Sequence, residues 1–175
     1  MTQTRRLPIL LAAIAVLAAG CEGAKSHAAA PATTTTTARP AQSVSVAALK
    51  AGVRTAVGAD LQLSLYVLWH NRVPAWATRT TRGPALAALR GAAATRRRQG
   101  IQIKNLSGHD TIVTITLGPS DKTATAVVID KQRVAPYKSG HRLGRAITGT
   151  DHSRIELHRL GNTRRFIVWS VSPIQ

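Results

Sequence analysis

The stretch IELHRLGNTRRFIVWSVSPI, residues 155–174, decides the fold because two apolar runs flank a short polar turn. The dipeptide Gly161-Asn162 at its centre is typical of a two-residue β-hairpin turn. Folding around this turn sorts apolar from polar side chains, which a register one residue away would not do. The predicted pairs are Leu157 with Phe166 and Ile155 with Val168 on one face, and Glu156 with Ile167 and Arg154 with Trp169 on the other.

A second hairpin is predicted upstream of the first. Gly118-Pro119-Ser120-Asp121 is typical of a type I or II turn, with proline at its favoured second position. The turn places apolar residues on one face and threonines on the other, where they are good cross-strand partners. The predicted pairs are Ile115 with Ala124 and Val113 with Ala126 on the apolar face, and Thr116 with Thr123 and Thr114 with Thr125 on the other.

The sequence before these hairpins has helical periodicity. Val46, Leu49, Val53 and Val57 recur at helical spacing after Ser45, a plausible N-cap. A further helical stretch runs from a capping Asp60 over DLQLSLYVLWHNRV, and another from about Pro84 to a stop at Gly100. Helices followed by hairpins predict an α+β fold, with N-terminal helices packed on one face of a curved antiparallel sheet.

This order of elements, with the W-x-V ending of Trp169–Val171, resembles the NTF2-like (cystatin-like cone) superfamily over most of residues 44–175. The resemblance implies a cone-shaped fold but no particular function, because that fold hosts isomerases, transport factors and domains without catalysis. Its enzymes place an Asp or a His-Asp pair inside the cone as a base. The adjacent pair here is His109-Asp110. Because neighbouring residues in a strand point to opposite faces, we do not expect these two to form a catalytic dyad. We expect them to belong to a turn and to the start of a strand.

The N-terminus has the order of a secretory leader. Arg5 and Arg6 precede an apolar core of residues 7–17, which is shorter than the roughly 20 residues that span a bilayer. The core ends in LAAGC, whose Cys21 is the only cysteine in the chain. This ending resembles the lipobox of bacterial lipoproteins, although Ala18 stands where leucine is commonest. The resemblance implies a signal peptide over residues 1–20 and lipid attachment at Cys21; an ordinary cleaved leader is the alternative.

Residues 21–43 are rich in Ala, Thr and Pro and show no apolar period. Such a segment buries too little surface to offset its ordering entropy, so we expect a disordered tether. The folded domain is then 44–175, a common size for one domain. The expected location is the extracytoplasmic face of a bacterial cell membrane, where the protein is held by lipid.

The chain is strongly basic, with a formal net charge of +17 and a pI near 11.8. Such a charge favours anionic partners: anionic lipid, a wall polymer or an acidic protein. The candidate contacts are Arg96, Arg97, Arg98, Arg164 and Arg165. Nucleic acid is not expected, because the few aromatic residues fall in apolar periods typical of a core.

The sequence contains no recognisable catalytic set, and no cofactor is expected. His141, His152 and His158 lack the paired spacing of metal ligands, so no metal site is predicted. We therefore expect a lipid-anchored extracytoplasmic binding or accessory module and not an enzyme. The alternative is a small-molecule-binding or isomerase-type site inside the cone, lined by residues such as Tyr66 and Trp69. That alternative predicts a pocket with a buried polar group of shifted ionisation.

Overall fold

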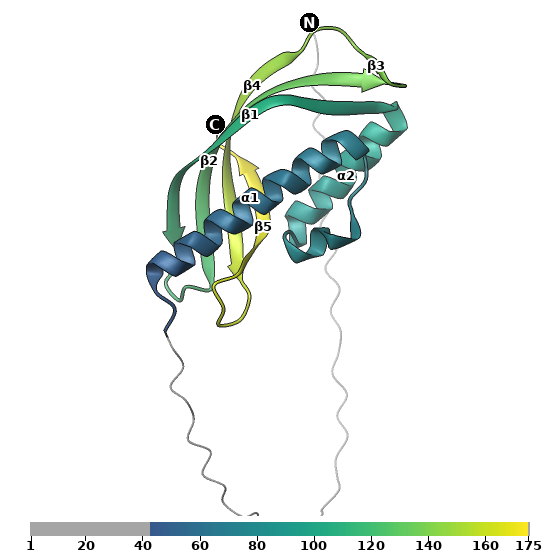
Figure 1. Ribbon diagram of the computed structural model, residues 1–175. Helices are drawn as coiled ribbons and strands as arrows, with labels where there is room; N and C mark the ends of the chain where they lie inside the picture. Colours follow the sequence, from purple (N-terminus) through teal and green to yellow (C-terminus); the bar gives the residue numbers. More distant parts are fainter. Residues whose placement is uncertain (1–42, 175) are drawn as a thin grey trace, which may run out of the picture. The chain divides into compact units, whose positions relative to one another are not determined.

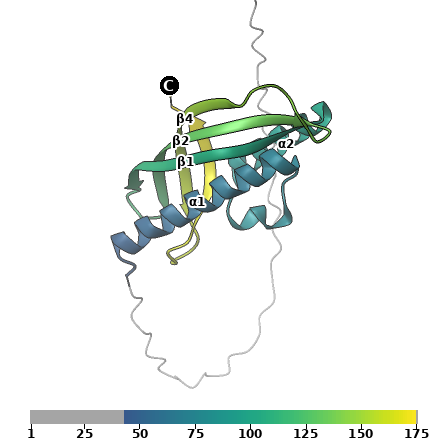
Figure 2. The ribbon, with the colours of Figure 1, turned by 45° about the horizontal axis from the view of Figure 1, so that its top comes forward.

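The computed structural model describes residues 43–174, which form the predicted α+β fold. The leader and the tether predicted before them lie outside the described residues. The five-stranded antiparallel sheet has the order β1-β2-β4-β5, with the short β3 on β2, and both helices lie on its concave face (Figure 1, Figure 2). The elements are α1 (Val46–His70), the 3-10 helix η1 (Ala75–Arg79), α2 (Gly83–Gln99), β1 (Ile101–Leu117), β2 (Thr123–Lys138), β3 (His141–Arg142), β4 (Ile147–Arg159) and β5 (Phe166–Pro173).

Helix α1 is continuous, whereas the sequence suggested two helical stretches. Its start is as predicted: the Ser45 hydroxyl accepts a hydrogen bond from the Ala48 amide at 3.2 Å. It ends at Asn71, which has the left-handed φ of 52° and donates its N–H to the Val67 carbonyl. The prediction that Asp60 caps a helix is wrong, because this residue lies in the middle of α1 and is buried.

Helix α2 agrees closely with its prediction. Pro84 occupies the first turn, where a missing N–H costs nothing. Gly100 ends the helix with a φ of 66° and donates its N–H to the Arg97 carbonyl, so the predicted stop is confirmed.

Both predicted turns form, but each hairpin loop is two residues longer than expected. In the first, the Asp121 amide donates to the Gly118 carbonyl at 3.0 Å, which is the predicted turn. Asp121 then takes a left-handed φ of 54°, and pairing begins only at Thr123, whose carbonyl accepts from the Gly118 amide at 2.9 Å. Ile115 therefore pairs with Ala126 instead of Ala124. Val113 also differs: a bulge between Ile112 and Thr114 leaves it 52% exposed.

The second hairpin differs from its prediction in the same way. The Thr163 amide donates to the Leu160 carbonyl, but the strands close only where the Leu160 amide meets the Arg165 carbonyl at 2.9 Å. Leu157 consequently pairs with Val168 and not with Phe166. A shift of two residues keeps the side chains next to the turn on their predicted faces, because strands have a period of two. A bulge between Glu156 and Leu157 then adds one residue, so Ile155 pairs with Val171 and not with Val168. The apolar face is still as predicted, since Ile155, Leu157, Phe166 and Val168 are all buried.

Two hydrophobic clusters hold the domain together. The first joins the N-terminal half of α1 to the sheet: Leu49, Val53 and Val57 pack with β2, β4 and β5 side chains such as Val128 and Leu157. The second joins the C-terminal half of α1 to η1 and α2, and its buried members are Leu63, Val67, Ala77, Leu86 and Ala93. The concave face of the sheet is thus covered tightly only along part of its length.

Candidate functional site

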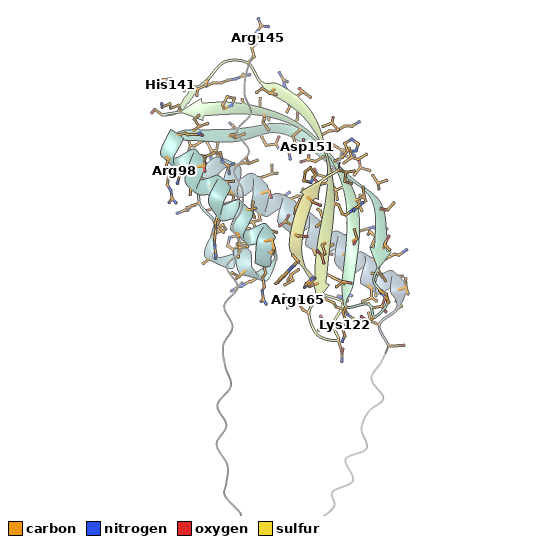
Figure 3. The ribbon with its side chains drawn as sticks, turned by 180° about the vertical axis from the view of Figure 1, so that it is seen from behind. Arg98, Lys122, His141, Arg145, Asp151 and Arg165 are labelled. Atoms are coloured by element: carbon orange, nitrogen blue, oxygen red, sulfur yellow. The ribbon has the colours of Figure 1, made fainter. Side chains whose placement is uncertain are left out.

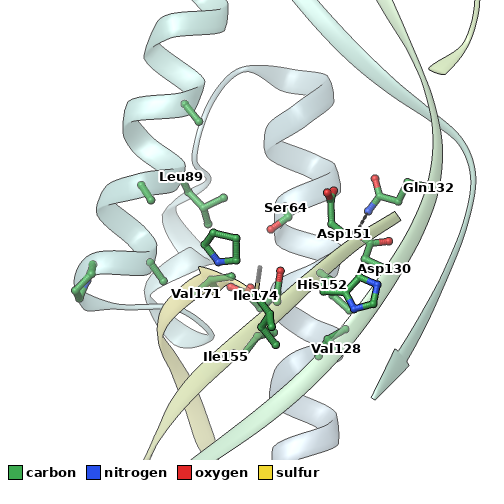
Figure 4. A pocket seen from close by; sticks show the side chains of 18 of the residues that line it. Ser64, Leu89, Val128, Asp130, Gln132, Asp151, His152, Ile155, Val171 and Ile174 are labelled. Atoms are coloured by element: carbon green, nitrogen blue, oxygen red, sulfur yellow. Dashed lines mark hydrogen bonds between the residues drawn. The ribbon is translucent and has the colours of Figure 1, made fainter. Parts of the chain in front are cut away.

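A pocket opens between the middle of α1, the helix α2 and the sheet (Figure 4). Its volume is about 770 Å³, which is within the range of small-molecule sites. Much of the wall is apolar, with contributions from both helices and three strands. These apolar residues include Leu61, Leu89, Val128, Ile155, Val171 and Ile174.

Short side chains on α2 keep this pocket open. Ala85, Ala88 and Ala92 recur every three or four residues and all line it, so one face of the helix offers methyl groups where larger side chains would fill the space. On the opposite wall, the inward positions of β2 change from Val128 to Asp130 and Gln132. The apolar core therefore stops at Val128, and the hollow beyond it has a polar lining.

Asp60 is the buried polar group of this pocket. It lies on α1 between Val57 and Leu63, which are both fully buried, and is itself only 5% exposed. The Thr81 hydroxyl donates a hydrogen bond to its Oδ1 at 2.5 Å. Burial raises the pKa of Asp60 above its ordinary value, and the hydrogen bond from Thr81 opposes that rise.

Three further carboxylates form a row across the sheet. Asp110 of β1 pairs in register with Asp130 of β2, which pairs in register with Asp151 of β4. The Gln132 side-chain amide donates to Oδ2 of Asp130, whereas Oδ1 of Asp130 is buried without a partner. Figure 4 shows Asp130, Asp151 and Gln132 together on one side of the pocket.

The ionisation of Asp130 is shifted by these surroundings. Burial is the largest cause, and the neighbouring Asp110 and Asp151 add to it, while the hydrogen bond from Gln132 acts in the opposite direction. Together they raise the pKa of Asp130 to about 6. Two carboxyls of the pocket, Asp60 and Asp130, thus hold a proton more readily than an ordinary aspartate.

The pocket is acidic in a basic protein. The chain has 24 Lys and Arg against seven Asp and Glu. Asp60, Asp130 and Asp151 line the pocket, and Asp110 lies beside Asp130, so most of the chain's acidic residues gather here. Neither Lys nor Arg occurs among the described residues that line it. The charge of the pocket is therefore opposite to that of the chain.

The aromatic residues predicted to line the cone lie elsewhere. Tyr66 packs edge-on against Trp76, with ring centroids 6.1 Å apart, and Trp69 packs against Tyr137 at 5.7 Å. Neither Tyr66 nor Trp69 borders the pocket, so that detail of the prediction is wrong. Both residues lie near the C-terminal end of α1, where Tyr66 packs with the cluster that joins α1 to η1 and α2, and Trp69 packs against Tyr137 of β2.

His109 and Asp110 lie on opposite faces of β1, as the alternation predicts, since His109 pairs with Lys131 and Asp110 with Asp130. The prediction that they mark the strand entry is wrong, because β1 begins at Ile101 and they lie in its middle. A β-bulge between Asn105 and Ser107 lies just before them in the strand.

The five predicted surface arginines fall in two places. Arg96, Arg97 and Arg98 form the last turn of α2, whereas Arg164 and Arg165 lie on the loop between β4 and β5. Figure 3 shows Arg98 and Arg165 well apart, at different ends of α2. The structure therefore does not bring the five together as one patch.

Arg96 has a structural role within the first group. It is half-buried, and its Nε donates to Oδ1 of Asn71 at 3.2 Å, which connects α2 to the end of α1. Burial lowers the pKa of Arg96. Arg97, by contrast, borders a shallow hollow with Arg72 and Arg90.

The second group borders a different hollow. Arg164 and Arg165 join Arg79 around a space of about 490 Å³ beside the small residues of α1, among them Gly52 and Ala56. This hollow has the charge expected of a contact for anions, so its electrostatic character is opposite to that of the acidic pocket.

The pocket carboxylates are not among the site residues predicted from the sequence, although the spacing of residues in the sequence could have located two of them. Extending the inward series Ala124, Ala126 and Val128 by one period reaches Asp130. Asp60 is three residues from both Val57 and Leu63, on the apolar face of α1, which a capping residue would not be. Asp151 follows from the pairing of β4 with β2, which the sequence did not specify.

No group of three or more His, Cys, Asp or Glu side chains within residues 43–174 is arranged to hold a metal ion. No helix in the same range is long and apolar enough to cross a membrane. Cys21, the predicted lipid attachment site, lies outside the described residues, so its role stays a prediction.

Comparison with known proteins gives structural neighbours only. No family model matches the chain, and no curated protein matches it in sequence. The fold is similar to the intermembrane space region of chloroplast protein ARC6, with a TM-score of 0.59 and 10% identity over 70% of this chain and 93% of that one. Aln2 from a Streptomyces species gives a TM-score of 0.46 at 16% identity, covering 69% of this chain and 88% of Aln2. A protein from Catenulispora acidiphila gives 0.41 at 14% identity, covering 71% of this chain and 93% of the other. The first of these likenesses supports the α+β fold.

Proposed function

We propose that this protein is a lipid-anchored extracytoplasmic binding module whose domain takes a small, largely apolar molecule into the pocket between its helices and its sheet. The observation that carries the proposal is the open cavity of about 770 Å³, with apolar walls and the buried carboxyl of Asp60. A concave apolar site with a few convergent polar groups of shifted pKa is the usual form of a ligand site.

The sequence supports the anchored location. The lipobox-like LAAGC places a lone cysteine where a lipoprotein is acylated, and the Ala/Thr/Pro-rich residues 21–43 have the composition of a spacer. An NTF2-like relationship is part of the same proposal, and the likeness to the ARC6 region supports the fold that it requires.

Binding is a better interpretation of the pocket than isomerase chemistry. Carboxyls with a raised pKa in an apolar cavity are also what a general base needs. The two shifted carboxyls are, however, held by the protein: Asp60 accepts from Thr81, and Asp130 accepts from Gln132 beside Asp110. We therefore assign them to recognition of a ligand and not to proton abstraction.

The test is binding of the neutral apolar dye N-phenyl-1-naphthylamine, followed by its fluorescence. Ala88 lines the pocket, so Ala88→Trp should fill it and abolish most of the signal. Ala87→Trp is the matched control, because Ala87 is exposed on the same helix and does not line the pocket. Equal dye binding by both variants, or none by the unmodified chain, would contradict the proposal.

A second candidate function is contact with an anionic surface. The hollow bordered by Arg79, Arg164 and Arg165 favours it, because three guanidinium groups gather around one depression. Anionic lipid headgroups, a wall polymer or an acidic protein would suit this charge. Such a contact is compatible with ligand binding, since the two hollows use different residues.

A further inference from the structure

We propose that the ligand of the concave pocket carries a positively charged nitrogen, such as a primary amine, attached to an apolar body. This inference rests on the proposed function and specifies the class of molecule that the pocket takes. The cation would lie beside Asp130 and Asp151, with the apolar body between α2 and the sheet.

The first argument is the separation of charge. A ligand site for an anion would be expected to draw on some of the chain's 24 Lys and Arg residues, yet the pocket lining contains three aspartates, one histidine (His152) and neither Lys nor Arg. The low dielectric of apolar walls strengthens the field of these carboxylates inside the hollow. A cationic ligand is therefore attracted, and an anionic ligand of the same shape is repelled.

The second argument is the geometry of the carboxylates. Asp130 and Asp151 are in register on adjacent strands, and neighbouring strands lie roughly 4.8 Å apart, so one ammonium group can donate to both. Oδ1 of Asp130 is buried and accepts no hydrogen bond from an N–H or hydroxyl of the described domain, and the Asp110 carboxyl lies within hydrogen-bonding reach of Asp130. A donor cation would satisfy this acceptor and relieve the repulsion between the two carboxyls. Asp60 reaches the same pocket from α1, on the opposite wall.

The third argument concerns the size of the cation. The residues of the described domain are not arranged to hold a metal ion, and the cavity is far larger than any ion requires. Leu61, Leu89 and Ile174 offer an apolar surface next to the carboxylates. An organic ammonium with a hydrocarbon portion can place its charge beside the carboxylates and its hydrocarbon portion against the apolar wall.

The experiment displaces N-phenyl-1-naphthylamine from the full-length chain with octylamine, octanol and octanoate at about pH 8, which is above the pKa of Asp130 and below that of an alkylamine. We expect octylamine to act at a concentration about tenfold lower than octanol, with octanoate weakest. Asp151→Asn should remove most of the advantage of the amine. Asp121→Asn is the matched control, because Asp121 is outside the pocket and its left-handed φ tolerates asparagine.

The outcomes separate the inference from the proposed function. Dye binding that Ala88→Trp abolishes, with equal displacement by amine and alcohol, would overturn the inference and leave the proposed function standing. An equal effect of Asp151→Asn and Asp121→Asn would also overturn it. A chain that binds no dye and whose thermal unfolding is unaffected by octylamine would contradict both. Since Asp151 is exposed and repels Asp130, its variant should unfold at the same or a slightly higher temperature, so a loss of binding would not reflect a loss of folding.

Discussion

Asp130 on β2 is paired in register with Asp151 on β4, so two carboxylates stand side by side on one face of the sheet, with Asp110 continuing the row on β1. Like charges directly opposite each other destabilise a sheet. The arrangement is therefore a local disadvantage to folding in a chain that has only seven acidic residues. Departures of this kind are expected at functional sites, and this one borders the open part of the concave face.

Replacing Asp130 with Asn should stabilise the domain near neutral pH. The pKa of Asp130 is raised to about 6, so between pH 4 and 6, roughly, the folded state keeps a proton that the unfolded state has lost. Stability consequently falls as the pH rises through this window, and the penalty is complete above it. We expect a gain of about 1 kcal/mol at about pH 7.5, since solvent screens this partly exposed site.

The measurement for Asp130→Asn is chemical denaturation at several pH values. The gain should shrink towards zero at about pH 3, below the ordinary pKa of an aspartate, where the wild-type carboxyl is largely protonated in both states. Asn can still accept the hydrogen bond from Gln132, so this contact is kept. A variant that is less stable at neutral pH, or a gain that does not depend on pH, would show that Asp130 is not strained by its neighbours.

Removing the hydroxyl of Thr81 should destabilise the domain. Thr81 is fully buried and donates to Oδ1 of Asp60, so Thr81→Val would leave a buried carboxyl without this donor. The expected loss is about 1–3 kcal/mol in the free energy of unfolding. Thr81→Ser retains the hydroxyl and should lose less. A loss in Thr81→Ser as large as or larger than the loss in Thr81→Val would contradict this assignment, because the methyl group, which only the serine variant lacks, would then matter at least as much as the hydrogen bond.

A methyl group at Gly52 should interfere with the packing of α1 on the loop between β4 and β5. A Cβ there would overlap the Arg164 carbonyl oxygen, which is backbone and has little freedom to move. Gly52→Ala should therefore lower the unfolding temperature even though alanine favours helix. Gly58→Ala is the control, because its Cβ would meet nothing within 4 Å and alanine should add about 1 kcal/mol. A stabilising effect at both positions would argue against the close approach.

Two groups of arginines should contribute unequally to binding of anionic vesicles. Exchanging Arg79, Arg164 and Arg165 for Gln should weaken binding more than exchanging Arg96, Arg97 and Arg98, because the first three border one hollow and Arg96 is used within the fold. The measurement is cosedimentation with phosphatidylglycerol vesicles at low and high salt, with neutral vesicles as the control. Equal binding by both triple variants and the wild type would remove the second candidate function.

Substitution of Cys21 should release the protein from the membrane. If Cys21 carries lipid, the wild type recovered from bacterial membranes should begin at this residue and show added acyl mass. Cys21→Ser should have neither property and should appear in the soluble fraction. Intact-mass spectrometry distinguishes the alternatives. A wild-type chain that begins elsewhere without added mass would favour an ordinary secreted protein.

The sequence was sufficient to predict the elements and the faces of the sheet, but not the lengths of its loops. In both hairpins the turn forms at the predicted residues, Gly118–Asp121 and Gly161-Asn162, but the loop that closes around it is two residues longer than expected. The register is set by tertiary closure as well as by the turn residues, so the local sequence alone placed Ile115 and Leu157 two positions away from their true partners. The shift is even next to each turn, which kept the apolar face correct there, whereas bulges farther along the strands changed the register again and left Val113 exposed.

The pocket depends on relationships that local patterns do not contain. Asp60 has the chemistry of a helix cap, and only the continuity of α1 through Gly58 and Ala59 shows that it is an interior residue. The row of carboxylates requires three strands to be aligned, and β4 pairs with β2 across a long connection. Alanines at regular spacing on α2 would fit a close contact with another element of the fold as well as they fit an open pocket. Sequence periodicity therefore locates the core better than it locates the space that the core leaves open.

The most direct test of the central claim is an NMR titration of the ¹⁵N-labelled full-length chain with octylamine, using octanol for comparison. The account predicts saturable amide shifts concentrated around Asp60, Asp130 and Asp151, with small changes at Arg164 and Arg165. Shifts confined to the arginine hollow, or none at concentrations of amine that leave the fold intact, would contradict the claim that the concave pocket binds a cationic, partly apolar ligand.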